Sequence, residues 1–208
     1  MNNRFDEDAA SWDAKEYRIR LAESVAAAVR KEVKLNRGME LLDFGCGTGL
    51  ASLPLAPEVA ALTGLDNSSG MLEVFMEKAA GMNLGNVRSL NLNLGNRDVL
   101  TGSYDLILSS MAFHHVKDVP ALIRMLFNAL KPGGHLCVAD LDPDQGLFHS
   151  DNTDIHHFGF ERKQMTEFFR DAGLTQIRVT TAASLPRTGE DGVEREFPVF
   201  LVTGVKLK

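Results

Sequence analysis

The sequence predicts an α/β protein with a doubly wound parallel sheet and helices on both of its faces. Apolar runs of strand length alternate along the chain with segments whose apolar residues recur every three or four positions. The first apolar run, 39–44, leads into three glycines at alternate positions, as in a turn between a strand and a helix. The last two strand-like segments, 176–182 and 197–205, are joined by a polar stretch, 186–196, which favours an antiparallel last strand.

Composition bounds the class of protein. A chain of 208 residues with 44% hydrophobic and 24% charged residues fits one globular domain. It contains no apolar run long enough to span a membrane, and its polar, acidic N-terminus does not fit a signal peptide. Two cysteines, Cys46 and Cys137, predict no disulfide framework and a reducing, cytoplasmic location. A net charge of -6 argues against a surface that coats nucleic acid.

The N-terminal part precedes the first strand. Residues 1–14 are polar and include the single tryptophan, Trp12, which either caps the surface or folds over a ligand site. Residues 16–33 have apolar positions at helical spacing. We expect residues 1–34 to form an arm and a helix that pack on the core or cover it as a lid, and residues 35–208 to form the ligand-binding domain.

The glycine turn is the stretch around which the chain is organised. Its glycines let backbone N–H groups approach a ligand, and a helix over 50–56 would direct those groups from its N-terminus. The dinucleotide fingerprint G-x-G-x-x-G requires a third glycine where Leu50 stands. Asp43, two residues before Gly45, suits a cationic ligand such as the amino group and sulfonium of S-adenosylmethionine better than a pyrophosphate. A turn that binds nothing, or an NAD oxidoreductase, remains an alternative.

Polar residues follow the next strands. The strand 60–66 ends in Asp66, whose carboxylate can accept hydrogen bonds from both hydroxyls of an adenosine ribose, or can cap the helix 70–80 that follows. The third strand, 87–92, leads to Asn93 and Leu94, and the amide oxygen of Asn93 can accept a hydrogen bond from an adenine amino group. The fourth strand, 104–110, continues into a stretch that contains His114 and His115.

The second half of the chain continues the alternation. A helix over 118–130 is stopped by the turn K-P-G-G at 131–134, and the strand 135–141 follows. A loop rich in Asp and His, 142–159, leaves the carboxyl end of this strand, where open α/β sheets bind ligands. A helix over 161–172 then precedes the last two strands.

The glycine turn, Asp66, the stretch 104–115 and the K-P-G-G turn together resemble class I S-adenosylmethionine-dependent methyltransferases, in particular the small bacterial-type, ubiquinone-biosynthesis-like group. The resemblance covers residues 35–205. It implies seven strands in the order 3-2-1-4-5-7-6 with the last strand antiparallel, and S-adenosylmethionine as cofactor. It implies cofactor contacts from Asp43, Gly45, Cys46, Gly47, Thr48, Gly49, Asp66, Asn67, Met71, Asn93, Leu94 and Ser109.

Methyl transfer from a sulfonium is an in-line displacement, and a base is needed only if the acceptor must lose a proton. The candidates near the acceptor are His114, His115, His149 and His157. A structural role for each histidine is the alternative. The spacing of His149, His156 and His157 matches no standard set of zinc or iron ligands, so no metal site is predicted.

The favoured acceptor is a small organic molecule. An RNA or protein substrate is the first alternative, but the chain has no long basic run, and the residues 109–112 replace the N-P-P-Y-type motif of amino-methylating enzymes. A non-catalytic protein that binds the cofactor is the second alternative. The identity of the acceptor does not follow from the sequence.

Overall fold

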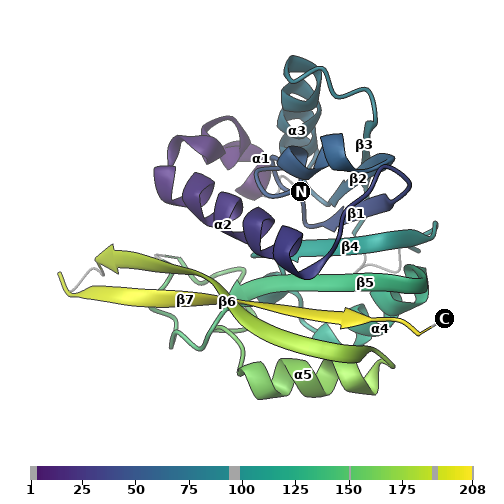
Figure 1. Ribbon diagram of the computed structural model, residues 1–208. Coiled ribbons are helices and arrows are strands. Elements are labelled where there is room, and N and C mark those ends of the chain that lie inside the picture. The colour runs from purple at the N-terminus through teal and green to yellow at the C-terminus, as the bar shows by residue number, and fades with distance from the viewer. Residues whose placement is uncertain (1–3, 94–98, 150, 189–191, 208) are drawn as a thin grey trace.

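The computed structural model describes residues 4–93, 99–149, 151–188 and 192–207. Seven strands form one sheet in the order β3-β2-β1-β4-β5-β7-β6, as predicted (Figure 1). All neighbouring strands are parallel except at β7, which runs antiparallel to both β5 and β6. The strands are β1 Glu40–Phe44, β2 Ala61–Asp66, β3 Val87–Asn91, β4 Tyr104–Ser110, β5 Leu130–Leu141, β6 Thr175–Thr188 and β7 Glu194–Val205.

Helices cover both faces of the sheet (Figure 1). The helices α2 (Glu16–Glu32) and α3 (Ser69–Gly81) contribute to one hydrophobic core, and α4 (Val119–Ala129) and α5 (Arg162–Asp171) contribute to the other. Successive strand residues supply opposite cores because side chains alternate across a strand. In β1, for example, Leu41 belongs to the first core and Leu42 to the second, and both are fully buried.

The segment after the glycine turn differs from the expected helix. The structure has a short 3-10 helix, η2 (Leu53–Glu58), in place of an α-helix over 50–56. Pro57 lies inside this segment and has no N–H to donate to an α-helical hydrogen bond, so a regular α-helix cannot continue through it. The segment nevertheless supplies Leu53 and Leu55 to the core.

Two other boundaries differ from the prediction. The K-P-G-G turn does end α4, but its residues lie within β5, where the pairing with β4 shifts between Tyr104–Leu130 and Leu106–His135. This irregularity absorbs the extra residues as a bulge does. The polar stretch 186–196, expected as a loop, continues β6 and β7 as a hairpin whose pairing reaches Thr188 and Glu194. Polar residues are tolerated there because this part of the hairpin extends past the end of β5.

The N-terminal arm, residues 4–14, consists of α1 (Arg4–Asp8) and the 3-10 helix η1 (Ala9–Ala14). It lies against α3 (Figure 1). Oδ1 of Asp6 accepts hydrogen bonds from the hydroxyl of Ser68 at 2.6 Å and from the N–H of Gly70 at 2.9 Å. The arm is therefore joined to the first turn of α3, immediately beside the carboxyl end of β2.

Candidate functional site

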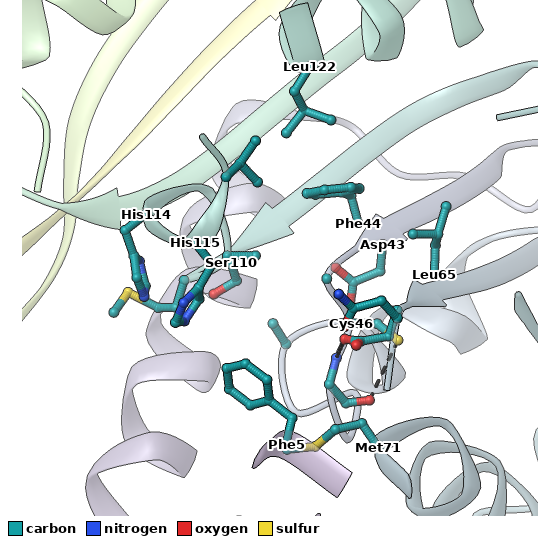
Figure 2. Close-up of a pocket in the computed structure, with 18 of the residues that line it drawn as sticks. Phe5, Asp43, Phe44, Cys46, Leu65, Met71, Ser110, His114, His115 and Leu122 are labelled. Atoms are coloured by element: carbon teal, nitrogen blue, oxygen red, sulfur yellow. Dashed lines mark hydrogen bonds between the residues drawn. The ribbon is translucent and has the colours of Figure 1, made fainter. Parts of the chain in front are cut away.

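A cavity of about 1070 Å³ lies at the carboxyl ends of β1, β2 and β4, and the N-terminal arm forms part of its wall. Figure 2 shows Asp43, Cys46 and Met71 on one side of the cavity, His114 and His115 on the other, and Phe5 from the arm between them. Parallel sheets place ligand sites at this edge because strand ends and loops meet there. The cavity brings together the predicted glycine turn and three of the four predicted histidines, His114, His115 and His149.

The glycine turn, residues 45–49, is held against β2. The N–H groups of Gly45 and Cys46 both donate to the carbonyl oxygen of Leu65, at 2.8 and 3.0 Å. The N–H of Gly47 donates to Oδ2 of Asp66 at 2.8 Å. Gly47 has a φ of 51° and space in front of it, since a Cβ there would meet no atom closer than 3.9 Å. Residues 45–48 line the cavity, and we expect their backbone to approach a ligand.

Asp43 supplies a buried carboxylate to the cavity. Asp43 is 2% exposed, and its Oδ1 has no hydrogen-bond partner among the described residues. Burial, with a smaller contribution from the charge of Asp66, raises the pKa of Asp43 to about 7, although the side chain of Ser52 acts in the opposite direction. A buried carboxylate without a partner is costly, and a cationic ligand would remove that cost. The amino group of S-adenosylmethionine fits this position by charge.

Asp66 organises the end of β2. In addition to the bond from Gly47, its Oδ1 accepts the N–H of Ser68 at 3.0 Å. The hydroxyl of Ser68 in turn accepts the N–H of Met71 at 3.1 Å and so caps α3. Burial raises the pKa of Asp66, although these hydrogen bonds oppose the shift. Ser68, and not Asp66, is thus the N-cap of α3; Asp66 instead holds the backbone of Gly47 and Ser68. Asp66 also lines the cavity together with Asn67, Met71 and Asn93.

Cys46 lines the cavity through the turn and is not placed as a nucleophile. Burial raises the pKa of its thiol well above the usual value, and the charges of Asp43 and Asp66 act in the same direction. A thiol in this state has little thiolate at neutral pH. The contribution of Cys46 is its backbone position beside Gly45.

Histidines form the opposite wall. The ring of His114 is 4.2 Å from that of His115 and 4.9 Å from that of His149, between centroids. Nδ1 of His114 lies 2.8 Å from Oδ1 of Asp140, and Nδ1 of His115 lies 2.8 Å from the carbonyl oxygen of Asp154. Burial lowers the pKa of His115 to about 4 and that of His149 to about 3, and neighbouring histidines add to both shifts. These two rings are therefore neutral at pH 7.

Three predicted residues do not line the cavity. Ser109 is fully buried in β4, and the next residue, Ser110, faces the cavity instead because side chains alternate along a strand. The Nε2–H of His157 is positioned to donate to the carbonyl oxygen of Val116 at 3.0 Å, and its ring lies against Phe160. At Gly49 a Cβ would meet Phe75 at 2.4 Å, so this glycine permits packing of η2 and α3. Leu94 lies outside the described residues.

Several lining residues were not predicted. Phe5, Arg18, His156 and Phe148 contribute to the wall. Trp12 also lines the cavity, in line with the second of the two roles considered for it, and the guanidinium of Arg18 lies 3.5 Å from its ring centroid. Asp140, which contacts His114 but does not line the cavity, was also not predicted, although an acid near the end of a predicted strand was a usable signal. Within the ranges that the structure describes, no three His, Cys, Asp or Glu residues are arranged to hold a metal ion.

Comparison with known proteins identifies the family of this chain. The family described as "Methyltransferase domain" matches residues 15–179, which is more than half of the chain. The chain belongs to this methyltransferase family. The sheet order and the glycine turn agree with its class I, S-adenosylmethionine-dependent members.

Individual relatives of the methyltransferase domain agree with this assignment. An uncharacterized methyltransferase of Schizosaccharomyces pombe is 36% identical over 68% of this chain and 55% of its own length. A demethylmenaquinone methyltransferase of Listeria monocytogenes is 32% identical over 53% of this chain and 48% of its own. The crystal structure of the YcgJ protein from Bacillus subtilis covers 89% of this chain and 99% of its own, with a TM-score of 0.73 and 18% identity.

The chain thus spans about half the length of the curated relatives it matches. The structural likeness to YcgJ, at 18% identity, concerns the fold. Among the described residues, no helix combines the length and apolar character needed to cross a membrane.

Proposed function

We propose that this chain transfers a methyl group from S-adenosylmethionine to a small organic molecule. The observation that carries the proposal is the buried, unpartnered carboxylate oxygen of Asp43 next to a glycine turn in a cavity. When bound, the cofactor supplies a methyl group on a positively charged sulfur, which an acceptor can attack in line. The protein contributes mainly by holding the two reactants in position.

The cofactor side of the cavity is assigned to the glycine turn and the strand ends. Asp43 pairs with the amino group of the cofactor. Each oxygen of Asp66 already accepts one backbone N–H, and a carboxylate oxygen retains a further lone pair that a ribose hydroxyl can use. Asn93 follows the end of β3 and also lines the cavity, and we assign it to the adenine.

The dimensions and lining of the cavity support a small acceptor. Pockets for single ligands span about 300–1,000 Å³. A volume of about 1070 Å³ lies at the top of that range, which leaves room for an acceptor beside the cofactor. The remaining wall is rich in aromatic rings, including Phe5, Trp12 and Phe148. The N-terminal arm and the loop 142–159 border this part of the cavity, which favours a molecule that enters whole over a polymer that lies across it.

The test uses S-adenosylmethionine labelled in its methyl group, the purified chain and a desalted host lysate separated into small molecules, RNA and protein. We expect label in the small-molecule fraction. The variant Asp43→Asn, which keeps the shape of the side chain and removes its charge, should lower both cofactor affinity and label transfer at least tenfold. Label fixed in RNA or protein would replace the proposal by the alternative substrate class. Absence of both transfer and cofactor binding would contradict it altogether.

A further inference from the structure

His114, which lines the cavity, forms a buried polar pair with Asp140 of β5 behind it. The exposed fraction is 1% for His114 and 0% for Asp140. Oδ1 of Asp140 lies 2.8 Å from Nδ1 of His114 and accepts the N–H of Leu141 at 2.8 Å. Oδ2 accepts the backbone N–H of His114 at 3.2 Å. Two backbone donors and one ring nitrogen thus fix the carboxylate.

These contacts determine the state of the carboxylate. Burial alone would raise the pKa of Asp140, but the interaction with His114 and the backbone N–H donors outweigh it and lower the pKa. Asp140 is therefore ionised and can only accept hydrogen bonds. The proton between the two side chains belongs to Nδ1 of His114, and in the neutral ring Nε2 then carries a free lone pair.

Nε2 of His114 is buried and has no hydrogen-bond partner among the described residues. His114 is among the residues that line the cavity, and Figure 2 shows its side chain across the cavity from Asp43 and Cys46. A buried nitrogen lone pair without a donor loses the hydrogen bond that water would give it. A hydroxyl group of a bound molecule would restore that bond. The lone pair therefore marks a position where a hydroxyl group of the methyl acceptor can donate a hydrogen bond.

Nε2 of His149 is also buried without a partner among the described residues, so the feature that distinguishes His114 is its bond to a carboxylate. The titratable groups around His114 are Asp140 from β5, His115 beside it and His149 from the loop 142–159, with Arg187 of β6 acting on His149. Nδ1 of His115 bonds to a carbonyl oxygen rather than to a carboxylate. A carboxylate stabilises the imidazolium that forms when a histidine takes a proton, and a carbonyl does so less. His114 is thus the ring best able to accept a proton.

We propose that His114 is the general base of this site, that Asp140 is its positioning residue, and that the acceptor is a phenol or enol methylated on its hydroxyl oxygen. This inference rests on the proposed function. In the step, the O–H bond breaks and its proton moves to Nε2, and the oxygen forms a bond to the methyl carbon. The carbon–sulfur bond breaks, its electron pair stays on sulfur, and S-adenosylhomocysteine and the methyl ether leave. The imidazolium then releases the proton to solvent.

The chemistry of the base selects this acceptor class. A carboxylate is already ionised at pH 7, and a neutral amine attacks through its own lone pair, so neither needs a base before transfer. A phenol with a pKa of about 10 is ionised in only about one molecule in a thousand at pH 7. A positioned general base typically contributes about 10²–10⁴ in rate, which is the range needed to offset that deficit.

The first experiment does not depend on activity. Protein labelled with ¹⁵N in its histidine rings is saturated with S-adenosylhomocysteine at pH 7.5, and the ring nitrogens are observed by NMR, with His114→Gln used to assign the signals. We expect His114 as the neutral tautomer protonated at Nδ1, and we expect Asp140→Asn to raise the share of the tautomer protonated at Nε2. A wild-type ring protonated at Nε2 would overturn the inference even if methyl transfer occurs, because Nε2 would then have no lone pair to take the proton.

The second experiment uses the small-molecule lysate fraction that takes label from S-adenosylmethionine. We expect the label in methyl ethers, which survive alkali. At pH 7, His114→Gln should lower kcat about 100-fold while the affinity for S-adenosylhomocysteine changes less than twofold, and the deficit should shrink toward pH 10, where a phenol ionises unaided. Asp140→Asn should give a smaller loss, and His135→Gln, in the middle of β5 and outside the cavity lining, should give none.

Other outcomes of this experiment separate the two proposals. Label in alkali-labile methyl esters or on amines would overturn the acceptor class while the methyltransferase function stands. A wild-type rate and pH profile for His114→Gln would overturn the role of His114. If no fraction takes label, the proposed function fails, and the tautomer measurement still decides whether His114 can act as a base.

Discussion

The hydroxyl of Thr48 donates a hydrogen bond of 2.6 Å to Oδ1 of Asp13, and so joins the glycine turn to the N-terminal arm. Oδ2 of the same carboxylate accepts from Nζ of Lys78 in α3, also at 2.6 Å. One side chain of the arm thus contacts two of the elements that form the cofactor side of the cavity. A ligand that binds at the glycine turn therefore binds next to an anchor of the arm.

Asp13→Ala should loosen the arm. Both hydrogen bonds are partly exposed, so we expect a loss of about 1 kcal/mol in the free energy of unfolding and a several-fold weaker affinity for S-adenosylhomocysteine. Chemical denaturation and calorimetry measure the two effects. The control is Asp8→Ala in the same arm, because the Asp8 side chain makes no capping hydrogen bond to η1. Equal effects from both variants would show that Asp13 is not an anchor.

Cofactor binding should release a proton near pH 7 through Asp43. The pKa of this carboxyl is about 7, so about half of the molecules carry the proton at pH 7. A cationic amino group favours the charged form and lowers that pKa, which expels the proton. Calorimetry with S-adenosylhomocysteine in buffers of different ionisation enthalpy measures the number released. We expect up to about half a proton at pH 7 for the wild type and close to none for Asp43→Asn; proton uptake would contradict this assignment.

The histidine wall should make the fold sensitive to acid. The pKa values of His115 and His149, about 4 and 3, lie below the ordinary value of 6.5, so in this window the unfolded chain binds protons that the folded chain does not. Stability is then lost as the pH falls below about 6.5 toward 4. Between pH 7.5 and 5 we expect each histidine to account for about 1–2 kcal/mol of the loss. Urea denaturation of His149→Gln at both pH values should show a correspondingly smaller difference.

Gly49→Ala should destabilise the fold without acting on the ligand directly. Gly49 has a φ of 78°, and a Cβ would approach Phe75 to 2.4 Å and Leu53 to 2.8 Å. We expect a loss of about 2–3 kcal/mol in the free energy of unfolding. Gly85→Ala is the matched control, since a Cβ there would meet nothing within 4 Å, and its effect should stay within about 0.5 kcal/mol. Thermal denaturation of both variants provides the comparison.

The strand order and the cofactor side of the cavity were open to prediction because they depend on local patterns. Buried parallel strands are read as apolar runs, and the residues at their ends, such as Asp43 and Asp66, then fall on one edge of the sheet. The 3-10 helix η2 was also within reach, since Pro54 and Pro57 stand in its sequence. The expected α-helix was wrong because the type of helix was inferred from the apolar residues alone and the two prolines were not considered.

The acceptor side was less predictable because its contacts join distant parts of the chain. His114 and Asp140 are 26 residues apart, and nothing in the local sequence pairs them. The four histidine candidates looked equivalent in sequence, yet His157 lies outside the cavity and His156, which was not chosen, lines it. The acids of the arm, such as Asp6 and Asp13, read as solvated charges until their partners 62 and 65 residues away are known.

The arm's long-range anchors also impose an order on folding. A helix of five residues such as α1 does not form alone in water, and each anchor of the arm needs a partner that the chain synthesises later. The docking site for Asp6 exists only once β2 has ended and α3 has begun, and Asp13 must also wait for Lys78. The arm therefore leaves the ribosome before its partners and reaches its native position after them, and the cavity is completed when it does.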